Sequence, residues 1–165
     1  MSPPNSQGIS ECSFCHTKII VPQSIGATER EKISKFVELE KTAFHAGNFA
    51  DAVKYCDAIL EINPKDKDAW TDKAVATAWL TTEKEDRFQE AYSYIARLMQ
   101  LYPDAPSILE AKKKLQDIEV SWCTRMGREN NRRAADAFSY MNSSLGVQCA
   151  IAAMNYYFRF AHVLT

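Results

Sequence analysis

The chain has little of what a sheet-rich fold needs and lacks the common catalytic motifs. Its 165 residues include only five glycines and six prolines, too few for a fold built on many tight turns. It contains no phosphate-binding glycine loop, no paired-histidine metal motif and no nucleophile elbow. No histidine stands in a recognisable constellation with serine, cysteine and aspartate. We therefore expect no active site and a protein that is not an enzyme.

A strong charge of either sign is also missing. Lysine and arginine number 20 against 21 aspartates and glutamates, and the net charge is −1. This balance gives no overall attraction to nucleic acid or to an anionic membrane. The first ten residues, MSPPNSQGIS, show no basic region followed by an apolar run, so we expect no signal peptide and a cytoplasmic location. Five cysteines, an odd number, do not indicate a disulfide framework.

A block of apolar residues occurs twice in the chain at the same offsets before a proline. The two blocks are Phe49, Ala52, Tyr55, Ile59 and Ile62 before Pro64, and Phe88, Ala91, Tyr94, Leu98 and Leu101 before Pro103. The flanking Phe36 and Trp70 stand 34 positions apart. Helical spacing and stop signals predict helices over about 29–46, 49–62, 66–79 and 87–102. The second block carries five extra residues, which we place in the polar loop 81–86.

The repeated blocks resemble the tetratricopeptide repeat over roughly residues 33–105. The segments that carry the resemblance are GNFADAVKYCDAILEINPKDKDAW and FQEAYSYIARLMQLYP. It implies an all-α fold, a right-handed solenoid of antiparallel helix hairpins, with Ala52, Ala74 and Ala91 where helices approach closely. The chain departs from the repeat at a few positions. They are Glu40 at a usually small position, Lys73 at a usual leucine, and Cys56 and Ile95 at a usually aromatic position.

In such a solenoid the first helix of each repeat lines a concave groove, so the resemblance also implies a binding surface. Here the groove residues would be Val37, Lys41, Phe44, Thr71, Val75 and Trp79. Only Lys41 fits the pattern of repeats that clamp a partner's terminal carboxylate. We therefore expect a non-enzymatic scaffold or adaptor for another protein, with a groove that holds a foreign peptide or the chain's own C-terminal helix.

A short cysteine-containing segment, ECSFCHTKIIV, precedes the helices. It resembles the second knuckle of a zinc ribbon, which in some bacterial proteins precedes tetratricopeptide repeats. Cys12 and Cys15 supply two thiolates with zinc-ligand spacing, whereas a closed site needs four ligands. The alternatives are a zinc half-site completed by another chain, a degenerate knuckle with free thiols, and a c-type haem attachment motif. The corresponding alternative function is a zinc- or redox-responsive module.

The residues after Pro103 predict further helices. A helical stretch from Pro106 is expected to break or kink near Gly127 and Asn130, and a last helix runs from about Leu145 to the end. On this helix an apolar stripe opposes Gln148, Asn155 and Arg159; its members are Val147, Ile151, Met154, Phe158 and Ala161. An arginine inside a membrane-spanning helix costs about 2.5–3.5 kcal/mol, which argues against a membrane anchor.

We therefore expect this helix to cap the solenoid, with a partner or self-association surface as the alternative. Arg125, Arg128, Arg132 and Arg133 are interpreted as a solvated face rather than a phosphate-binding patch. The predicted organisation is a flexible arm (1–11), a cysteine knuckle and linker (12–28), two repeats (29–105) and C-terminal capping helices (106–165).

Overall fold

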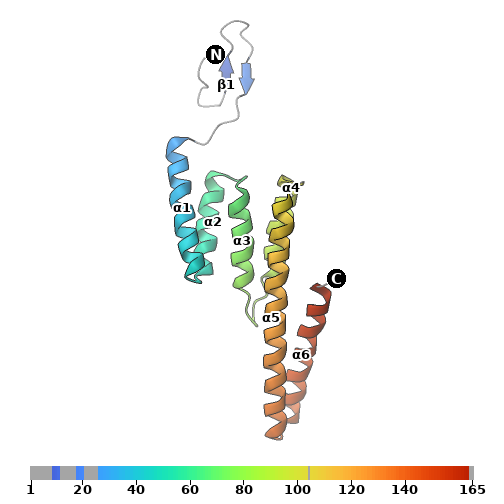
Figure 1. The fold of residues 1–165 in the computed structure, drawn as a ribbon. Helices are drawn as coiled ribbons and strands as arrows, with labels where there is room; N and C mark the ends of the chain where they lie inside the picture. The colour runs from blue at the N-terminus through green and yellow to red at the C-terminus, as the bar shows by residue number, and fades with distance from the viewer. Residues whose placement is uncertain (1–8, 12–17, 21–25, 104, 164–165) are drawn as a thin grey trace.

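The chain folds into a row of helices preceded by a short β-hairpin (Figure 1). The structure is a computed structural model, and it describes residues 9–11, 18–20, 26–103 and 105–163. Strands β1 (Ile9–Glu11) and β2 (Lys18–Ile20) are antiparallel, and in their backbone register Glu11 lies opposite Lys18. The helices are α1 (Ala27–His45), α2 (Phe49–Ile62), α3 (Lys67–Trp79), α4 (Phe88–Leu101), α5 (Pro106–Ser139) and α6 (Ser143–Val163). The predicted all-α class is confirmed for the body of the protein, and β1 begins inside the segment 1–11 that we expected to be a flexible arm.

The helix boundaries follow from local capping residues. Gly47 adopts a positive φ of 71°, which ends α1, and the Asn48 side chain then accepts a hydrogen bond from the Asp51 backbone N–H. At the next turn Asp66 caps α3 by accepting a hydrogen bond from the Ala69 backbone N–H at 3.0 Å. The expected ends of α2 and α3 are therefore confirmed.

Helix α3 is the centre of the packing, because it contacts α2 on one side and α4 and α5 on the other. Towards α2, Ala69 packs with Ile59 and Leu60. Towards α4 and α5, Ala74 joins a larger core that includes Phe88. The three alanines expected at close helix approaches, at positions 52, 74 and 91, are all fully buried.

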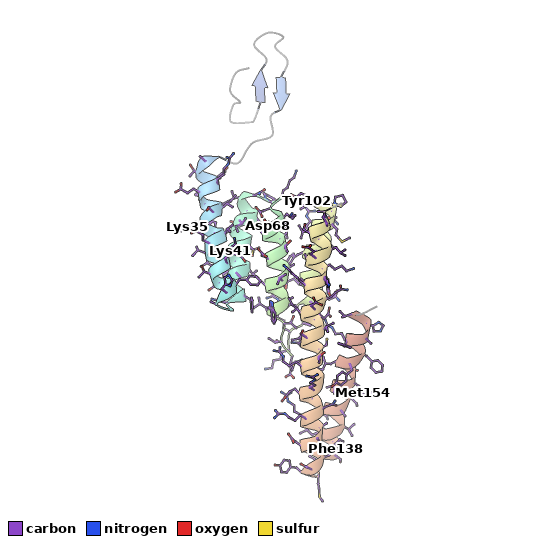
Figure 2. All side chains as sticks on the ribbon, viewed as in Figure 1. Lys35, Lys41, Asp68, Tyr102, Phe138 and Met154 are labelled. Atoms are coloured by element: carbon purple, nitrogen blue, oxygen red, sulfur yellow. The ribbon has the colours of Figure 1, made fainter. Side chains whose placement is uncertain are left out.

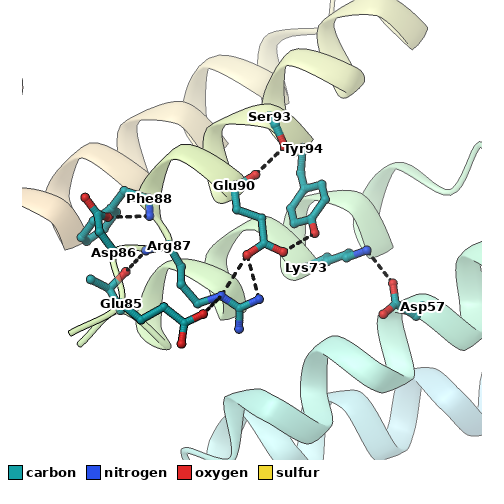
Figure 3. A network of polar contacts seen from close by, with 10 residues as sticks. Asp57, Lys73, Glu85, Asp86, Arg87, Phe88, Glu90, Ser93 and Tyr94 are labelled. Carbon is teal, nitrogen blue, oxygen red and sulfur yellow. Dashed lines mark hydrogen bonds and ion pairs between the residues drawn. The ribbon is translucent and has the colours of Figure 1, made fainter. Parts of the chain in front are cut away.

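A polar network links α2, α3 and α4 on one side of α3 (Figure 3). Lys73 forms an ion pair with Asp57 at 2.6 Å, and its ammonium lies 4.4 Å from the ring centroid of Tyr94. The Tyr94 hydroxyl donates to Glu90 at 2.7 Å, and Glu90 also pairs with Arg87. Lys73 replaces an apolar residue of the repeat pattern, and its ion pair and cation–π contact let it occupy this half-buried position.

Helix α5 is continuous over 34 residues, so the predicted break near Gly127 and Asn130 is wrong. The Asn130 side chain donates to the Met126 carbonyl at 2.9 Å, which satisfies its amide within the helix. A Cβ atom at Gly127 would lie 2.9 Å from the ring of Tyr157. The glycine is there because α6 packs close against α5, not because the helix ends.

Helix α6 packs along α5, and the hairpin they form extends beyond the other helices (Figure 1). The stripe expected to be buried is exposed, with Val147, Ile151, Met154 and Phe158 between 50% and 63% accessible. Figure 2 marks Met154 on this hairpin. The prediction chose the wrong face, because α6 turns its small and aromatic side chains inward to fit against α5; these are Gly146, Ala153, Tyr156 and Phe160.

Arg159 of α6 forms ionic contacts that fix the inward face of this helix. Its guanidinium pairs with the buried Glu119 of α5 at 2.6 Å and also with Asp86 in the loop before α4. It lies 5.2 Å from the ring centroid of Phe88. The Tyr92 hydroxyl donates to the other carboxylate oxygen of Glu119 at 2.9 Å. Within the described part of the chain, no helix combines the length and apolarity needed to cross a membrane.

Candidate functional site

Three helices place a common set of side chains on one face of the molecule. On α3, Asp68, Asp72, Val75 and Trp79 follow one another at intervals of four, three and four residues, which puts them on one stripe. The same spacing continues on α5, and α1 adds residues of the groove predicted from the sequence. We call these residues the shared face: Val37, Lys41 and Phe44 of α1, the four of α3, and Lys114, Ile118, Ser121, Arg125 and Arg128 of α5.

Aromatic rings join the shared face at the C-terminal ends of α1 and α3. Phe44 contacts Phe49 edge-on with ring centroids 5.3 Å apart, and Phe49 stacks on Trp79 at 5.5 Å. Trp79 is still 47% exposed. It borders a cavity of about 200 Å³ between α3 and α5, together with Ile118 and Trp122. The aromatic rings beside this cavity form a surface against which an apolar side chain of another molecule could pack.

The cavity beside Trp79 adjoins a wider depression along α5, whose charged lining residues are Arg125, Arg128 and Glu129. Ser121 and Arg125 line both the cavity beside Trp79 and a wider depression of about 720 Å³ that reaches Arg128. Neither Arg125 nor Arg128 forms an ion pair with any residue that the structure describes. These two guanidinium groups therefore keep their hydrogen-bonding capacity for a ligand.

The other two arginines of this cluster behave as the sequence predicted. Arg132 pairs with Glu129 at 2.9 Å, and Arg133 pairs with Glu129 at 3.3 Å and with Glu83 at 3.1 Å. Both belong to a solvated ionic face. The four arginines thus divide into a paired set and an unpaired set, a division that their spacing alone did not predict.

The opposite end of the shared face is acidic. A cavity of about 130 Å³ lies between α1, α2 and α3; its lining residues are Val37, Glu40, Lys41, Cys56, Ile59, Asp66, Asp68, Ala69 and Asp72. Figure 2 shows Lys41 and Asp68 at similar levels of α1 and α3. Four carboxylates therefore surround this small space, with Lys41 as the cation in its wall.

Glu40 is the buried carboxyl of this cavity, with only 4% of its surface exposed. Burial, and after it the negative charge of Asp72, raise the pKa of Glu40 from 4.5 to about 7. Burial and then the charge of Asp68 raise the pKa of Asp72 as well. Lys41 lowers both pKa values without an ion pair to either group. The cavity has an excess of negative charge, which Lys41, and at Asp72 also Lys114, offset in part.

The six predicted groove residues reach three different environments. Val37 and Lys41 line the acidic cavity, whereas Trp79 lines the cavity at α5 and connects to Phe44 through Phe49. The remaining two are half-buried. Val75 packs against the core of α3, α4 and α5, and the Thr71 hydroxyl donates to the Lys67 carbonyl at 3.0 Å.

Sequence reasoning missed the acidic cavity and the contribution of α5. Glu40 could have been singled out from the sequence, because a glutamate stands where the repeat pattern has a small residue. Nothing in the sequence singles out Asp72, because an acidic residue on a helix is usually exposed to solvent. Lys114, Ile118 and Arg125 join the site only because α5 packs beside α3, which no local pattern indicates.

The cysteines give no metal centre within the described residues. Cys12 and Cys15 lie outside them, in the stretch of sequence that follows β1 and precedes β2. Elsewhere in the described chain no group of three or more histidine, cysteine, aspartate or glutamate side chains could hold a metal ion. Cys56 and Cys123 are fully buried, and burial raises the pKa of both thiols, as expected for small core residues.

Comparison with known proteins found no match for the chain. No protein-family model matches the chain, and neither a curated protein nor a solved structure is similar to it.

Proposed function

We propose that the chain is a cytoplasmic, non-enzymatic scaffold that holds a segment of a partner protein along the shared face. The proposal includes a tetratricopeptide-type right-handed solenoid, in which α1–α2 and α3–α4 are repeats and α5 is the first helix of a further unit. The repeated offsets, the buried alanines at positions 52, 74 and 91, and the packing of α5 on α3 support this arrangement.

The observation that carries the proposal is the half-exposed Trp79 beside Arg125 and Arg128, which form no ion pair with a residue that the structure describes. An exposed tryptophan next to a cavity and free guanidinium groups is the composition of a protein-binding hot spot. An apolar side chain fits the cavity at Trp79, and carboxylates fit the two arginines. We therefore expect a partner segment with an apolar residue followed or preceded by acidic ones.

A charge-reversal variant tests the proposal. The double change Arg125→Glu and Arg128→Glu should abolish capture of a partner from an extract of the native organism. Because neither arginine pairs with a described residue, the far-UV circular dichroism and thermal midpoint should stay unchanged. The control is Lys35→Glu, which changes an exposed charge that Figure 2 shows at the outer edge of α1.

The control variant should capture the same proteins as the unmodified chain. If the double variant also captures them, the shared face is not the binding surface. The alternative function as a zinc- or redox-responsive module stays a prediction from Cys12 and Cys15. Zinc at about half an equivalent per chain in a dimer, measured on protein purified without chelator, would support that alternative.

A further inference from the structure

The acidic cavity has the chemical layout of a pocket for an alkyl ammonium group. Its lining combines the apolar Val37, Ile59 and Ala69 with the carboxylates of Glu40, Asp68 and Asp72, and it also includes Lys41. A volume of about 130 Å³ would hold about four waters, which is comparable with one lysine side chain. The methylene groups of such a side chain could lie on the apolar wall while its ammonium reaches the carboxylates.

Glu40 shows that the acidic end lacks a partner. Only 4% of the surface of this residue is exposed, yet no described residue donates a hydrogen bond to it or forms an ion pair with it. The carboxylate oxygens of Glu40 are not fully enclosed, so a donor that enters the cavity can reach them. Asp72 is half-buried in the same wall and also accepts no hydrogen bond within the described chain.

The missing partner has the properties of a single compact cation. Asp66 is occupied, because it caps α3 and accepts from Asn63, which leaves Glu40, Asp72 and the exposed Asp68. An ammonium carries three hydrogen-bond donors, so it can pair with Glu40 and also donate to a neighbouring carboxylate. A metal ion is disfavoured, because no described group of carboxylates, thiols or imidazoles is arranged to hold one.

We infer that the cavity lined by Glu40, Asp68 and Asp72 is a binding site for a primary ammonium group, presented as a lysine side chain of the partner segment. This inference rests on the proposed function, because it names a residue of the partner that the shared face holds. Asp72 and Trp79 are seven residues apart on α3, or about 10 Å. An extended segment covers that span with about three residues. The partner therefore carries a lysine about three residues from its apolar side chain.

The test uses the full chain, labelled with ¹⁵N, and the probe Nα-acetyl-lysine N-methylamide. We expect saturable shifts in the backbone amide signals of Glu40, Cys56, Ala69 and Asp72 at millimolar probe concentration. The probe whose ammonium is acetylated should produce no such shifts, because its charge is gone. Sodium chloride at the same ionic strength measures the effect of screening alone.

Two variants test whether the carboxylates hold the probe. Glu40→Gln and Asp72→Asn keep the shape of each side chain, and each should weaken probe binding at least about tenfold. Glu61→Gln is the matched control, since Glu61 is exposed on α2 and does not line the cavity; it should bind as the unmodified chain does. Circular dichroism confirms that the variants are folded. Equal shifts with the acetylated probe, or undiminished binding by Glu40→Gln, would overturn the inference.

The probe-binding experiment and the partner-capture experiment can fail independently of each other. If a partner is captured in a manner that depends on Arg125 and Arg128, yet the probe does not bind, the scaffold proposal stands and the ammonium site falls. If the probe binds but charge reversal leaves capture unchanged, the ammonium site stands and the shared face loses its role in partner binding.

Discussion

The buried carboxyl of Glu40 should make the stability of the protein fall as the pH rises, and Glu40→Gln should remove that effect. The folded state raises the pKa of Glu40 from 4.5 to about 7, first by burial and then by the charge of Asp72. Between these two pH values the unfolded chain loses the proton of Glu40 while the folded chain keeps it. The folded state therefore binds more protons, and its free energy of unfolding decreases with increasing pH.

The size of the effect follows from the shift in pKa. Each unit corresponds to 1.36 kcal/mol, so a rise from 4.5 to about 7 lowers the free energy of unfolding by about 3 kcal/mol once both states are ionised. Glutamine has the same shape and no charge to desolvate. The Glu40→Gln variant should consequently gain about 3 kcal/mol over the unmodified chain at about pH 8 and almost nothing at about pH 4.

Urea unfolding, followed by circular dichroism at several pH values, measures this difference directly. The quantity to plot is the free energy of unfolding of the variant minus that of the unmodified chain, because other titrating groups then largely cancel. Glu61→Gln, an exposed change on α2, should give a flat line. A flat line for Glu40→Gln as well would show that Glu40 is hydrated or paired in solution, which would refute the reasoning for the acidic cavity.

Four further substitutions test the packing. Arg159→Ala leaves the carboxylate of Glu119 buried without its charge partner and should lower the free energy of unfolding by about 3 kcal/mol in urea titration. Ala74→Leu adds volume at a fully buried position of the core and should lower it by about 1–3 kcal/mol, and a neutral result would mean that α3 does not pack as described. Ile151→Ser, on the exposed face of α6, should change it by less than about 0.5 kcal/mol, whereas Ala153→Leu on the inward face should cost about 1–3 kcal/mol.

The helices could be predicted from the sequence because their ends depend on neighbouring residues. Gly47, Asn48 and Asp66 cap their helices through contacts within a few positions, so the expected boundaries of α2 and α3 agree with the structure. The alanines of the repeated blocks could also be assigned to the core. Each cap lies within one helical turn of the backbone group it serves, whereas the alanines were assigned from the repeated spacing.

The faces of α5 and α6 could not be predicted in the same way. Gly127 is a helix breaker in a local reading, but its lack of a side chain accommodates Tyr157 of a helix that follows much later in the chain. On α6, the apolar stripe with the larger side chains has the stronger amphipathic pattern. The structure instead buries Gly146 and Ala153, because close approach to α5 depends on small volume and on the ionic contacts of Arg159.

Net charge is a sum over the chain, and this protein shows how little a sum says about a binding surface. From the value of −1 we expect no general attraction to polyanions, and this stays a prediction. Yet the shared face carries Glu40, Asp68 and Asp72 near α1 and the unpaired Arg125 and Arg128 on α5. A segment with a lysine at one end and acidic residues at the other would meet opposite charges in one orientation and like charges in the reverse. Because like-charge juxtaposition is strongly unfavourable at a desolvated interface, the proposed groove would select the direction of the bound chain as well as its composition.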